Sequence, residues 1–311
     1  MFVYRGFPSE RSVAGTALAI GNFDGVHVGH RALLTRLVAV AKEKGLSPAV
    51  LTFEPHPREF FEGVSAPPRL STLRQKLACI TAEGVECAFV RRFDRHFAAL
   101  SADDFVDRVL VEKLHTAYLI VGGDFRFGAG REGNFQSLRD AGRTRNFEVE
   151  AMSPVMLDGE GRVSSSAIRK ALQEGKLNRA GDLLGRPYSI TGRVIRGAKR
   201  GREMGAATAN IRIRDGKSPL FGVFAVEISD SGGAVWRGVA NLGFHPSVDE
   251  ASSPLLEAHL FDFSGDLYGR RLTVSFIHKI RDEIRFSGLD SLKARIADDI
   301  AAAKRFFQLS S

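Results

Sequence analysis

The sequence predicts two domains of different architecture: an α/β domain, then an antiparallel β domain that ends in a helix. Up to about residue 185, continuous apolar runs alternate with amphipathic stretches. After that point short strands follow one another between Gly, Pro, Asp and Ser turns, and a long helical pattern returns only at 289–307. Apolar strands separated by helices indicate a parallel sheet covered on both faces. Successive short strands favour an antiparallel barrel or sandwich.

The strands of the first domain are expected at 16–23, 48–53, 85–90 and 116–123. Helices are expected between them at 30–45, 71–84 and 101–115. The last of these begins with Ser101 as N-cap and Asp104 three residues later, an acidic variant of the capping box.

Six short strands are expected in the second domain, at 188–197, 208–213, 223–229, 234–242, 255–263 and 271–280. The boundary is placed in LLGRPY, where Gly185 and Pro187 end a helical stretch. The predicted domains are therefore 1–184 and 185–311.

The composition is that of a globular protein of 311 residues, with 44% hydrophobic and 26% charged residues. The sequence has no apolar run long enough for a signal peptide or a membrane helix. Its two cysteines, Cys79 and Cys87, have no metal or redox spacing. We therefore expect a protein of the reduced cytoplasm with no membrane partner.

The charge of the chain predicts an anionic ligand, because the net charge is +8 and the pI about 9.7. Basic residues are spread along the chain except for one dense patch, RVIRGAKRGR at 193–202. No aromatic residue interleaves this patch, and no nucleic-acid-binding signature surrounds it. Phosphorylated small molecules are therefore expected rather than nucleic acid.

The motif GNFDGVHVGH at 21–30 lies where the first expected strand leads into a helix. Free N–H groups and the positive end of the helix dipole favour an anion there, and glycines let the backbone approach it closely. His27 and His30 can donate hydrogen bonds to a phosphate.

Two other interpretations of this motif stay open. Asp24, His27 and His30 are plausible metal ligands, and a glycine-rich turn can carry two histidines by chance. The basic character of the chain suits an anion better than a cation, so phosphate is favoured.

Two further segments are candidates for ligand binding. GGDFRFG at 122–128 follows another expected strand, so it lies along the same sheet edge, although an ordinary turn would look the same. In GRVSSSAIR at 161–169, serines precede a helical run. They can act as a simple N-cap, or bind phosphate together with Arg162 and Arg169.

In the second domain, glycines recur at 197, 201 and 205 among basic residues, which favours a flexible loop over phosphates. Thr208 and Asn210 follow, two positions apart, and therefore face the same side of a strand. Their oxygens can bind Mg²⁺ and an ATP phosphate, although a T-x-N pair on a strand usually has no such role.

Together these motifs resemble the bacterial bifunctional riboflavin kinase/FAD synthetase family, whose nucleotidyltransferase signature is similar to GNFDGVHVGH. In the first domain the resemblance continues through TFEPHPREFF, VGGDFRFGAGREGN and VSSSAIRKAL. In the second it runs through GRVIRGAKRGREMG, TANI, GVANLG, LEAHLFDFSGDLYG and LDSL. It covers nearly the whole chain, in order.

The resemblance implies a Rossmann-like first domain that transfers AMP from ATP to FMN and releases pyrophosphate. His27 and His30 would then contact the ATP phosphates, and Asn22 and Asp24 would help hold the nucleotide. Asp124 would line the nucleotide–flavin site. The phosphate-binding segment would include Arg162, Ser165, Ser166 and Arg169. Ser166 stands where the family usually has threonine, and it keeps the hydroxyl.

For the second domain the resemblance implies a β-barrel that phosphorylates the 5′-hydroxyl of riboflavin. Thr208 and Asn210 would bind Mg·ATP, with Gly201 and Arg202 beside the nucleotide. Glu257 would act as the general base, since a carboxylate suits that role.

The chain departs from the family in two places. Ala206 and Ala207 replace the usual Phe-Pro before Thr-Ala-Asn, which removes bulk and stiffness beside the Mg²⁺ ligands. His245 and Ser247 also replace the usual arginine and threonine.

We therefore expect an enzyme that makes FMN and then FAD, with Mg²⁺ as cofactor and with ATP, riboflavin and FMN as partners. It is expected to be a monomer or a weak homo-oligomer. The alternatives are an FMN adenylyltransferase with an impaired kinase domain, or a non-catalytic protein that binds flavin or nucleic acid.

Overall fold

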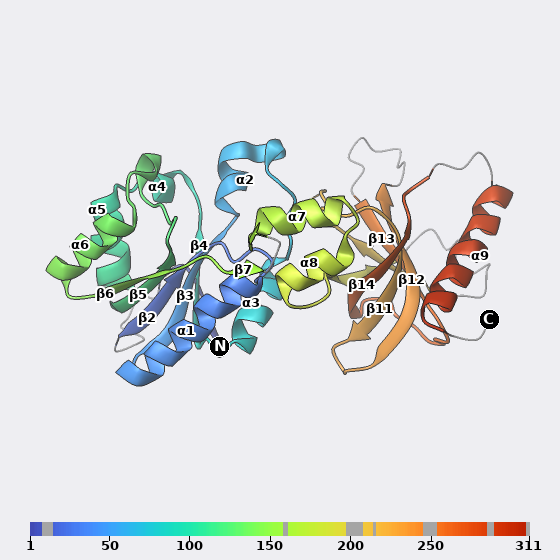
Figure 1. Ribbon diagram of the computed structural model, residues 1–311, viewed down its shortest axis with the longest axis horizontal. Coiled ribbons are helices and arrows are strands. Elements are labelled where there is room, and N and C mark those ends of the chain that lie inside the picture. Colours follow the sequence, from blue (N-terminus) through green and yellow to red (C-terminus); the bar gives the residue numbers. More distant parts are fainter. Residues whose placement is uncertain are drawn as a thin grey trace. The chain divides into compact units, whose positions relative to one another are not determined.

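A computed structural model describes residues 1–7, 15–157, 161–196, 208–213, 216–244, 254–284 and 289–308 (Figure 1). They belong to two compact units. Unit 1 comprises Met1–Pro67 and Ser71–Ser164, and unit 2 comprises Pro68–Leu70 and Ser165–Ser311. Unit 1 contains a parallel sheet with helices, and unit 2 a closed antiparallel barrel and a C-terminal helix. The predicted fold class is confirmed.

The sheet of unit 1 has six parallel strands in the order β1-β4-β3-β2-β5-β6. Their bounds are β1 Phe2–Arg5, β2 Thr16–Ile20, β3 Ser47–Glu54, β4 Cys87–Arg92, β5 Thr116–Gly122 and β6 Glu148–Met152. The four predicted strands are the inner ones. The two edge strands were not predicted, because they are short and more exposed and have no continuous apolar run.

Helices cover both faces of this sheet. One face packs against α1 (Val28–Lys44) and α3 (Leu73–Ala82), and the other against η2 (Phe105–Lys113) and α6 (Phe135–Arg145). Side chains alternate accordingly along β2: Ala17 and Ala19 join the α1 side, while Leu18 and Ile20 join the η2 side. All four are buried, so the strand reads as a continuous apolar run.

The remaining elements of unit 1 are short. They are α2 (Pro57–Glu62), η1 (Gly63–Ser65), α4 (Arg95–Ala98), α5 (Ala102–Asp104), η3 (Ala129–Arg131) and the hairpin β7 (Met156–Leu157) with β8 (Gly161–Arg162). The predicted helix at 101–115 is present as α5 followed by η2, a π-helix, and Ser101 caps it: its hydroxyl accepts the Asp104 N–H at 3.0 Å.

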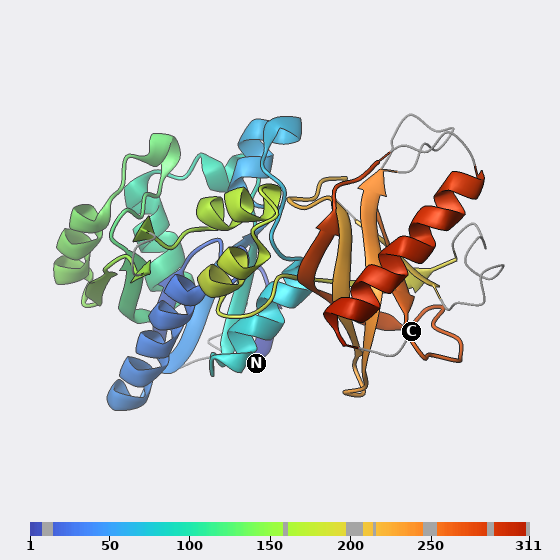
Figure 2. The same ribbon diagram turned by 45° about the vertical axis from the view of Figure 1, so that its right-hand side comes forward.

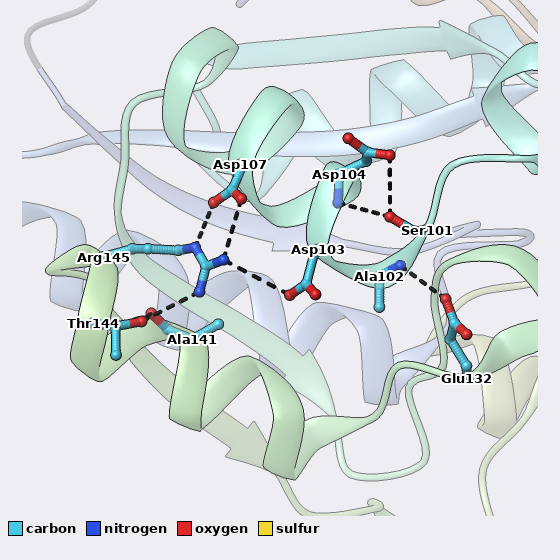
Figure 3. Close-up of polar contacts among 9 residues, drawn as sticks. All are labelled: Ser101, Ala102, Asp103, Asp104, Asp107, Glu132, Ala141, Thr144 and Arg145. Carbon is cyan, nitrogen blue, oxygen red and sulfur yellow. Dashed lines mark hydrogen bonds and ion pairs between the residues drawn. The ribbon is translucent and has the colours of Figure 1, made fainter.

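An arginine joins two of these helices on the η2 side of the sheet, and Figure 3 shows its contacts. Arg145, at the end of α6, donates from Nη2 to the Asp107 carboxylate of η2 at 3.1 Å. It also lies 3.7 Å from the Asp103 carboxylate. The hydrogen bond from Arg145 holds the pKa of Asp107 below its usual value. The contact fixes the relative position of two helices that cover the same face.

The barrel of unit 2 closes in the order β10-β13-β12-β11-β14-β9, with every neighbouring pair antiparallel. Its strands are β9 Ser189–Ile195, β10 Thr208–Arg212, β11 Gly222–Asp230, β12 Val235–Phe244, β13 Pro254–Leu260 and β14 Arg271–Arg281. All six correspond to predicted strands. Of the two predicted possibilities, barrel and sandwich, the barrel is the one formed. Phe224 and Phe276, both buried, meet edge to face with centroids 5.1 Å apart.

Three helices accompany the barrel: α7 (Ser165–Gln173), α8 (Leu177–Leu184) and α9 (Leu289–Phe306). Packing places α7 and α8 in unit 2, since α7 contacts α8 and α8 contacts β14. The domain division after residue 184 follows the sequence pattern and stays a prediction. Figure 2 shows α9, in red, lying across the barrel strands. It covers outward-facing Val223, Ala225 and Val239 with Ala303. Within the described ranges, no helix combines the length and the apolar character that crossing a bilayer requires.

A buried ion pair fastens α9 to the barrel, and its removal tests how much the contact stabilises unit 2. Arg281 on β14 donates to both carboxylate oxygens of Asp299, at 2.8 and 2.6 Å, and their side chains are only 14% and 7% exposed. Asp299→Ala leaves the guanidinium buried without this partner, which costs about 3–5 kcal/mol. Urea unfolding followed by the fluorescence of Trp236, the single tryptophan, should show a lower midpoint.

The neighbouring Asp298 provides the control for this prediction. Its side chain is 71% exposed and lies 3.9 Å from Arg295. Asp298→Ala should change the free energy of unfolding by about 0.5 kcal/mol or less. Equal midpoints for the two variants would contradict the assigned role of Asp299.

Candidate functional sites

The first candidate site is the turn that follows β2, which carries the GNFDGVHVGH motif. Phe23 and Val26 adopt positive φ angles of 48° and 41°. Such angles are rare for bulky or β-branched residues and cost about 1–3 kcal/mol each. Both side chains are 1% exposed and pack into the core on the α1 side of the sheet. Their burial offsets the strain and holds the turn in this shape.

Asp24 fastens the same turn to the beginning of α3. Its Oδ1 accepts the backbone N–H of Ser71 at 3.1 Å, and the Ser71 hydroxyl accepts the backbone N–H of Gly25, also at 3.1 Å. Asp24 is buried. The Asp24 carboxylate therefore holds the turn in position through its hydrogen bond with Ser71.

His27 is the N-cap of α1, because its Nδ1 accepts the backbone N–H of His30 at 3.2 Å. With Nδ1 accepting, a neutral His27 ring carries its proton on Nε2. The first turn of α1 has backbone N–H groups without partners inside the helix, and its dipole favours an anion. The cap therefore lies at the point where this helix would receive a phosphate.

His30 stacks on His27, with ring centroids 3.6 Å apart and planes 13° from parallel. Its Nδ1 is buried and finds no hydrogen-bond partner among the described residues. Burial above all, and then repulsion by His27 and by Lys76, hold the pKa of His30 well below its ordinary value of 6.5. His30 is therefore uncharged at neutral pH in the free protein.

Asn22 also lies in this turn, and its carbonyl oxygen accepts the hydroxyl of Thr52 on β3 at 3.4 Å. The Thr52 hydroxyl in turn lies 3.4 Å from the ammonium of Lys76 on α3. Sequence reasoning missed Lys76. A signal was present, because this lysine stands one turn before Ile80 on the apolar stripe of an amphipathic helix.

The predicted residues Asp124 and Arg162 lie together at the same sheet edge. Asp124 follows β5, which is paired with β2, and Arg162 belongs to the hairpin of β7 and β8. Arg162 Nη2 lies 2.6 Å from Asp124 Oδ2 in an exposed ion pair. The pair is open to solvent, so an anionic ligand can compete for the guanidinium.

The other predicted members of this site lie on α7, which belongs to unit 2. They are Ser165, Ser166 and Arg169. The Arg169 guanidinium is buried, and its Nε donates to the carbonyl oxygen of Pro68 at 2.7 Å. The structure does not bring these residues together with the histidine pair inside one unit, and their role in phosphate binding stays a prediction.

The metal interpretation of the histidine motif requires three ligand side chains around one point. In the parts of the chain that the structure describes, no group of three His, Cys, Asp or Glu residues is arranged to hold a metal ion. Asp24, His27 and His30 therefore do not form such a group.

The second candidate site lies on the outer face of the barrel, at β10 and β13. In the register of this pair Thr208 is opposite His259, and Asn210 is opposite Glu257. Residues directly opposite each other point to the same face of a sheet. Thr208, Asn210 and Glu257 therefore share one face, as the two-residue spacing of the first two predicts.

Asn210 carries an unsatisfied acceptor. Its side chain is 7% exposed, and its Oδ1 finds no hydrogen-bond partner among the described residues. A buried amide oxygen without a partner is costly. Oxygen ligands of this type, next to a carboxylate, suit Mg²⁺. The residues present therefore fit a magnesium ion, which Asn210 would help to hold.

Asn241 extends this row on the other side of Glu257, because it is opposite Glu257 in the pairing of β12 with β13. Three polar residues, Asn210, Glu257 and Asn241, thus stand side by side on neighbouring strands. Sequence reasoning missed Asn241, since only the register between strands reveals its place beside Glu257.

Several predictions for the barrel fall on residues outside the described ranges. These are the basic loop with Gly201 and Arg202, the pair Ala206 and Ala207, and the replacements His245 and Ser247.

Each half of the chain matches a family model. The model described as FAD synthetase matches residues 9–167, and the one described as riboflavin kinase matches residues 184–307. The first match includes the turn after β2, and the second includes the row on β10, β13 and β12.

Relatives similar to the whole chain carry both activities in their names. A bifunctional riboflavin kinase/FMN adenylyltransferase of Haemophilus influenzae is 46% identical, over 96% of both chains. One of Escherichia coli strain K12 is 45% identical, over 97% of this chain and 96% of its own.

A solved structure is similar over the whole length as well. It is a crystal structure from Streptococcus pneumoniae named macrolide-efflux protein, with a TM-score of 0.81 and 26% identity over 97% of this chain and 98% of its own. That name differs from the names of the relatives of higher identity, which agree with both family models. The chain belongs to the family of bifunctional riboflavin kinase/FMN adenylyltransferases.

Proposed function

We propose that this chain phosphorylates riboflavin to FMN on its barrel and adenylylates FMN to FAD at the β2 turn of unit 1. The observation that carries the proposal is the presence of two separate polar sites, one in each unit. Each lies within the match to the family model that names the corresponding activity. ATP is the co-substrate of both reactions.

Adenylyl transfer at the β2 turn needs positioning and charge stabilisation, without a covalent enzyme intermediate. A phosphate oxygen of FMN attacks the α-phosphorus of ATP, and the bond to the β-phosphate oxygen breaks to release pyrophosphate. His27, with its cap bond on Nδ1, presents Nε2–H to the phosphates. His30 lies against it and stabilises the same developing charge.

The other residues of this site hold the ligands or the turn. Asp24 keeps the turn in place through Ser71, and Asn22 lies in the same turn beside the nucleotide. Asp124 and Arg162, which form an ion pair at the end of β5, contact the nucleotide and the flavin in this proposal. The phosphate-binding role of Ser165, Ser166 and Arg169, on α7, stays a prediction that rests on the resemblance.

Phosphoryl transfer on the barrel starts from Glu257, which removes the proton of the 5′-hydroxyl of riboflavin. The hydroxyl oxygen then attacks the γ-phosphorus of ATP, and ADP leaves. Thr208 and Asn210 hold Mg²⁺ and phosphate oxygens, with Gly201 and Arg202 beside the nucleotide. The magnesium ion, when bound, offsets the negative charge of the phosphates. Asn241 flanks Glu257 and orients the carboxylate.

The partners that this proposal requires are small molecules: ATP, riboflavin and FMN. The positive net charge of the chain attracts the anions ATP and FMN rather than nucleic acid. We place the enzyme in the cytoplasm, as a monomer or weak homo-oligomer.

The first test supplies the purified chain with riboflavin, ATP and Mg²⁺ and identifies the products by chromatography. We expect FMN to appear first and FAD to follow. If FAD forms only when FMN is supplied, the chain is an adenylyltransferase with an impaired kinase, as Ala206 and Ala207 would allow. Salt-sensitive oligonucleotide binding without turnover would instead support the non-catalytic alternative.

The second test separates the two sites. His27→Ala should lower FAD synthesis about 100- to 1,000-fold, as expected for loss of one transition-state donor, and leave FMN synthesis intact. Glu257→Ala should lower FMN synthesis about 100- to 10,000-fold, as expected for loss of a general base, and leave FAD synthesis from added FMN intact. Loss of both activities in one folded variant would disprove the division into two sites.

The third test uses the charge state of His30. Because its pKa in the folded protein lies below the unfolded value, the unfolded chain binds a proton below pH 6.5 that the folded one does not. Stability of unit 1 should therefore fall as the pH drops below 6.5, by up to about 1.4 kcal/mol per pH unit. Hydrogen exchange of amides in β2 and α1 at pH 7.5 and 5.5 measures this.

His30→Gln, which does not titrate, is the comparison for the third test. The protection of the β2 and α1 amides in this variant should depend less on pH than in the original protein, because unfolding no longer lets His30 bind a proton. An identical pH dependence in the two proteins would show that folding does not lower the pKa of His30.

A further inference from the structure

We propose that the Lys76 ammonium, beneath the turn after β2, attracts the phosphates of ATP to the adenylyl-transfer site. It acts as a positioning residue, through the field it creates beneath the turn after β2. This inference rests on the proposed adenylyl transfer at that turn.

The burial of Lys76 is the first observation behind the proposal. Lysine side chains usually extend their charge to water, whereas this side chain, on α3, is only 4% exposed. Taking an ammonium out of water costs several kcal/mol. The charge of Lys76 is therefore kept inside unit 1 instead of being extended into the solvent.

The position of the ammonium is the second observation. Its Nζ lies 3.4 Å from the Thr52 hydroxyl, which donates to the Asn22 carbonyl oxygen, also at 3.4 Å. Thr52 and Asn22 stand at the carboxyl ends of the neighbouring strands β3 and β2. The charge thus lies below the motif, at the sheet edge where parallel sheets bind their ligands.

The charge state of the histidine pair is the third observation. His30 is faced by the stacked ring of His27 and by the Lys76 ammonium, and the Asp24 carboxylate of the same turn bonds to Ser71. Burial, His27 and Lys76 all lower the pKa of His30. An uncharged imidazole cannot attract the triphosphate over a distance. Lys76 supplies that attraction, and in a buried site it is little screened by salt.

Two functions therefore follow from one side chain. The ammonium draws ATP to the turn, and it adds to the burial and the repulsion by His27 that lower the pKa of His30. His30 then meets the nucleotide as a neutral imidazole whose Nδ1 is still without a partner among the described residues.

The test compares Lys76→Met with the original full-length protein at pH 8. Methionine keeps most of the volume and removes the charge. The KM for ATP in FAD synthesis from FMN should rise about 10- to 100-fold, as expected for loss of an interaction with a charged group. The KM for ATP in riboflavin phosphorylation, measured on the same sample, should not change, because that reaction is proposed for unit 2. Hydrogen exchange of the β2 and α1 amides shows that unit 1 of the variant is folded.

A second readout separates this role from a structural one. Titration of His30 by NMR should show a higher pKa in Lys76→Met than in the original protein, because one source of repulsion is gone. A lysine that only fastened α3 to β3 would leave this titration unchanged. Lys76→Gln, measured in the same way, replaces the methionine variant if that protein does not fold.

Lys42→Met is the matched control, since it removes one charge from an exposed position on α1. It should leave both KM values and the His30 titration unchanged. An unchanged KM for ATP in Lys76→Met or Lys76→Gln, or a His30 pKa that does not rise, overturns the proposal. Absence of FAD formation by the original protein would instead overturn the proposed function itself, so the two failures are distinguishable.

Discussion

The reversal of strand order beside β2 is the constraint on which unit 1 depends. The sheet runs β4-β3-β2 in one direction and continues from β2 to β5 and β6 in the other. Connections that leave neighbouring strands in opposite directions open a crevice at the carboxyl ends of those strands. The turn with His27 follows β2, and Asp124 follows β5. Two segments about a hundred residues apart in the chain thus meet at one edge, and Lys76 enters beneath it from α3.

In unit 2 the corresponding constraint is the register of the barrel. Its inner face is filled by residues such as Phe224 and Phe276, and only the alternate positions of each strand are left to carry chemistry. Register places Asn210, Glu257 and Asn241 in one row on that outer side. The α9 helix covers apolar positions of the same face. Core and site are therefore set by the same pairing of strands.

Periodicity and composition were sufficient to predict the inner strands, the helices α1, α3, η2 and α9 and the antiparallel second half, because burial on both faces or on one face leaves a clear pattern. The helix α6 was not predicted. The edge strands β1 and β6 were not predicted, because their pairing depends on a neighbouring strand rather than on their own apolar content. The histidine turn was recognisable from local chemistry. Lys76 and Asn241 were not, because their significance comes from contacts across the sheet and the barrel, which no local pattern encodes.

The turn after β2 satisfies two opposing demands. Positive φ angles at Phe23 and Val26 favour glycine, whereas the core beneath them requires large apolar side chains. The backbone path around the histidines is thus imposed by the packing of the α1 side and not by the turn's own preference. The geometry of the phosphate site is consequently a collective property of unit 1. A substitution that replaces a core side chain on the α1 side by a smaller one therefore changes the conformation of the turn that binds the nucleotide. This holds even where the substituted residue is far from the ligand.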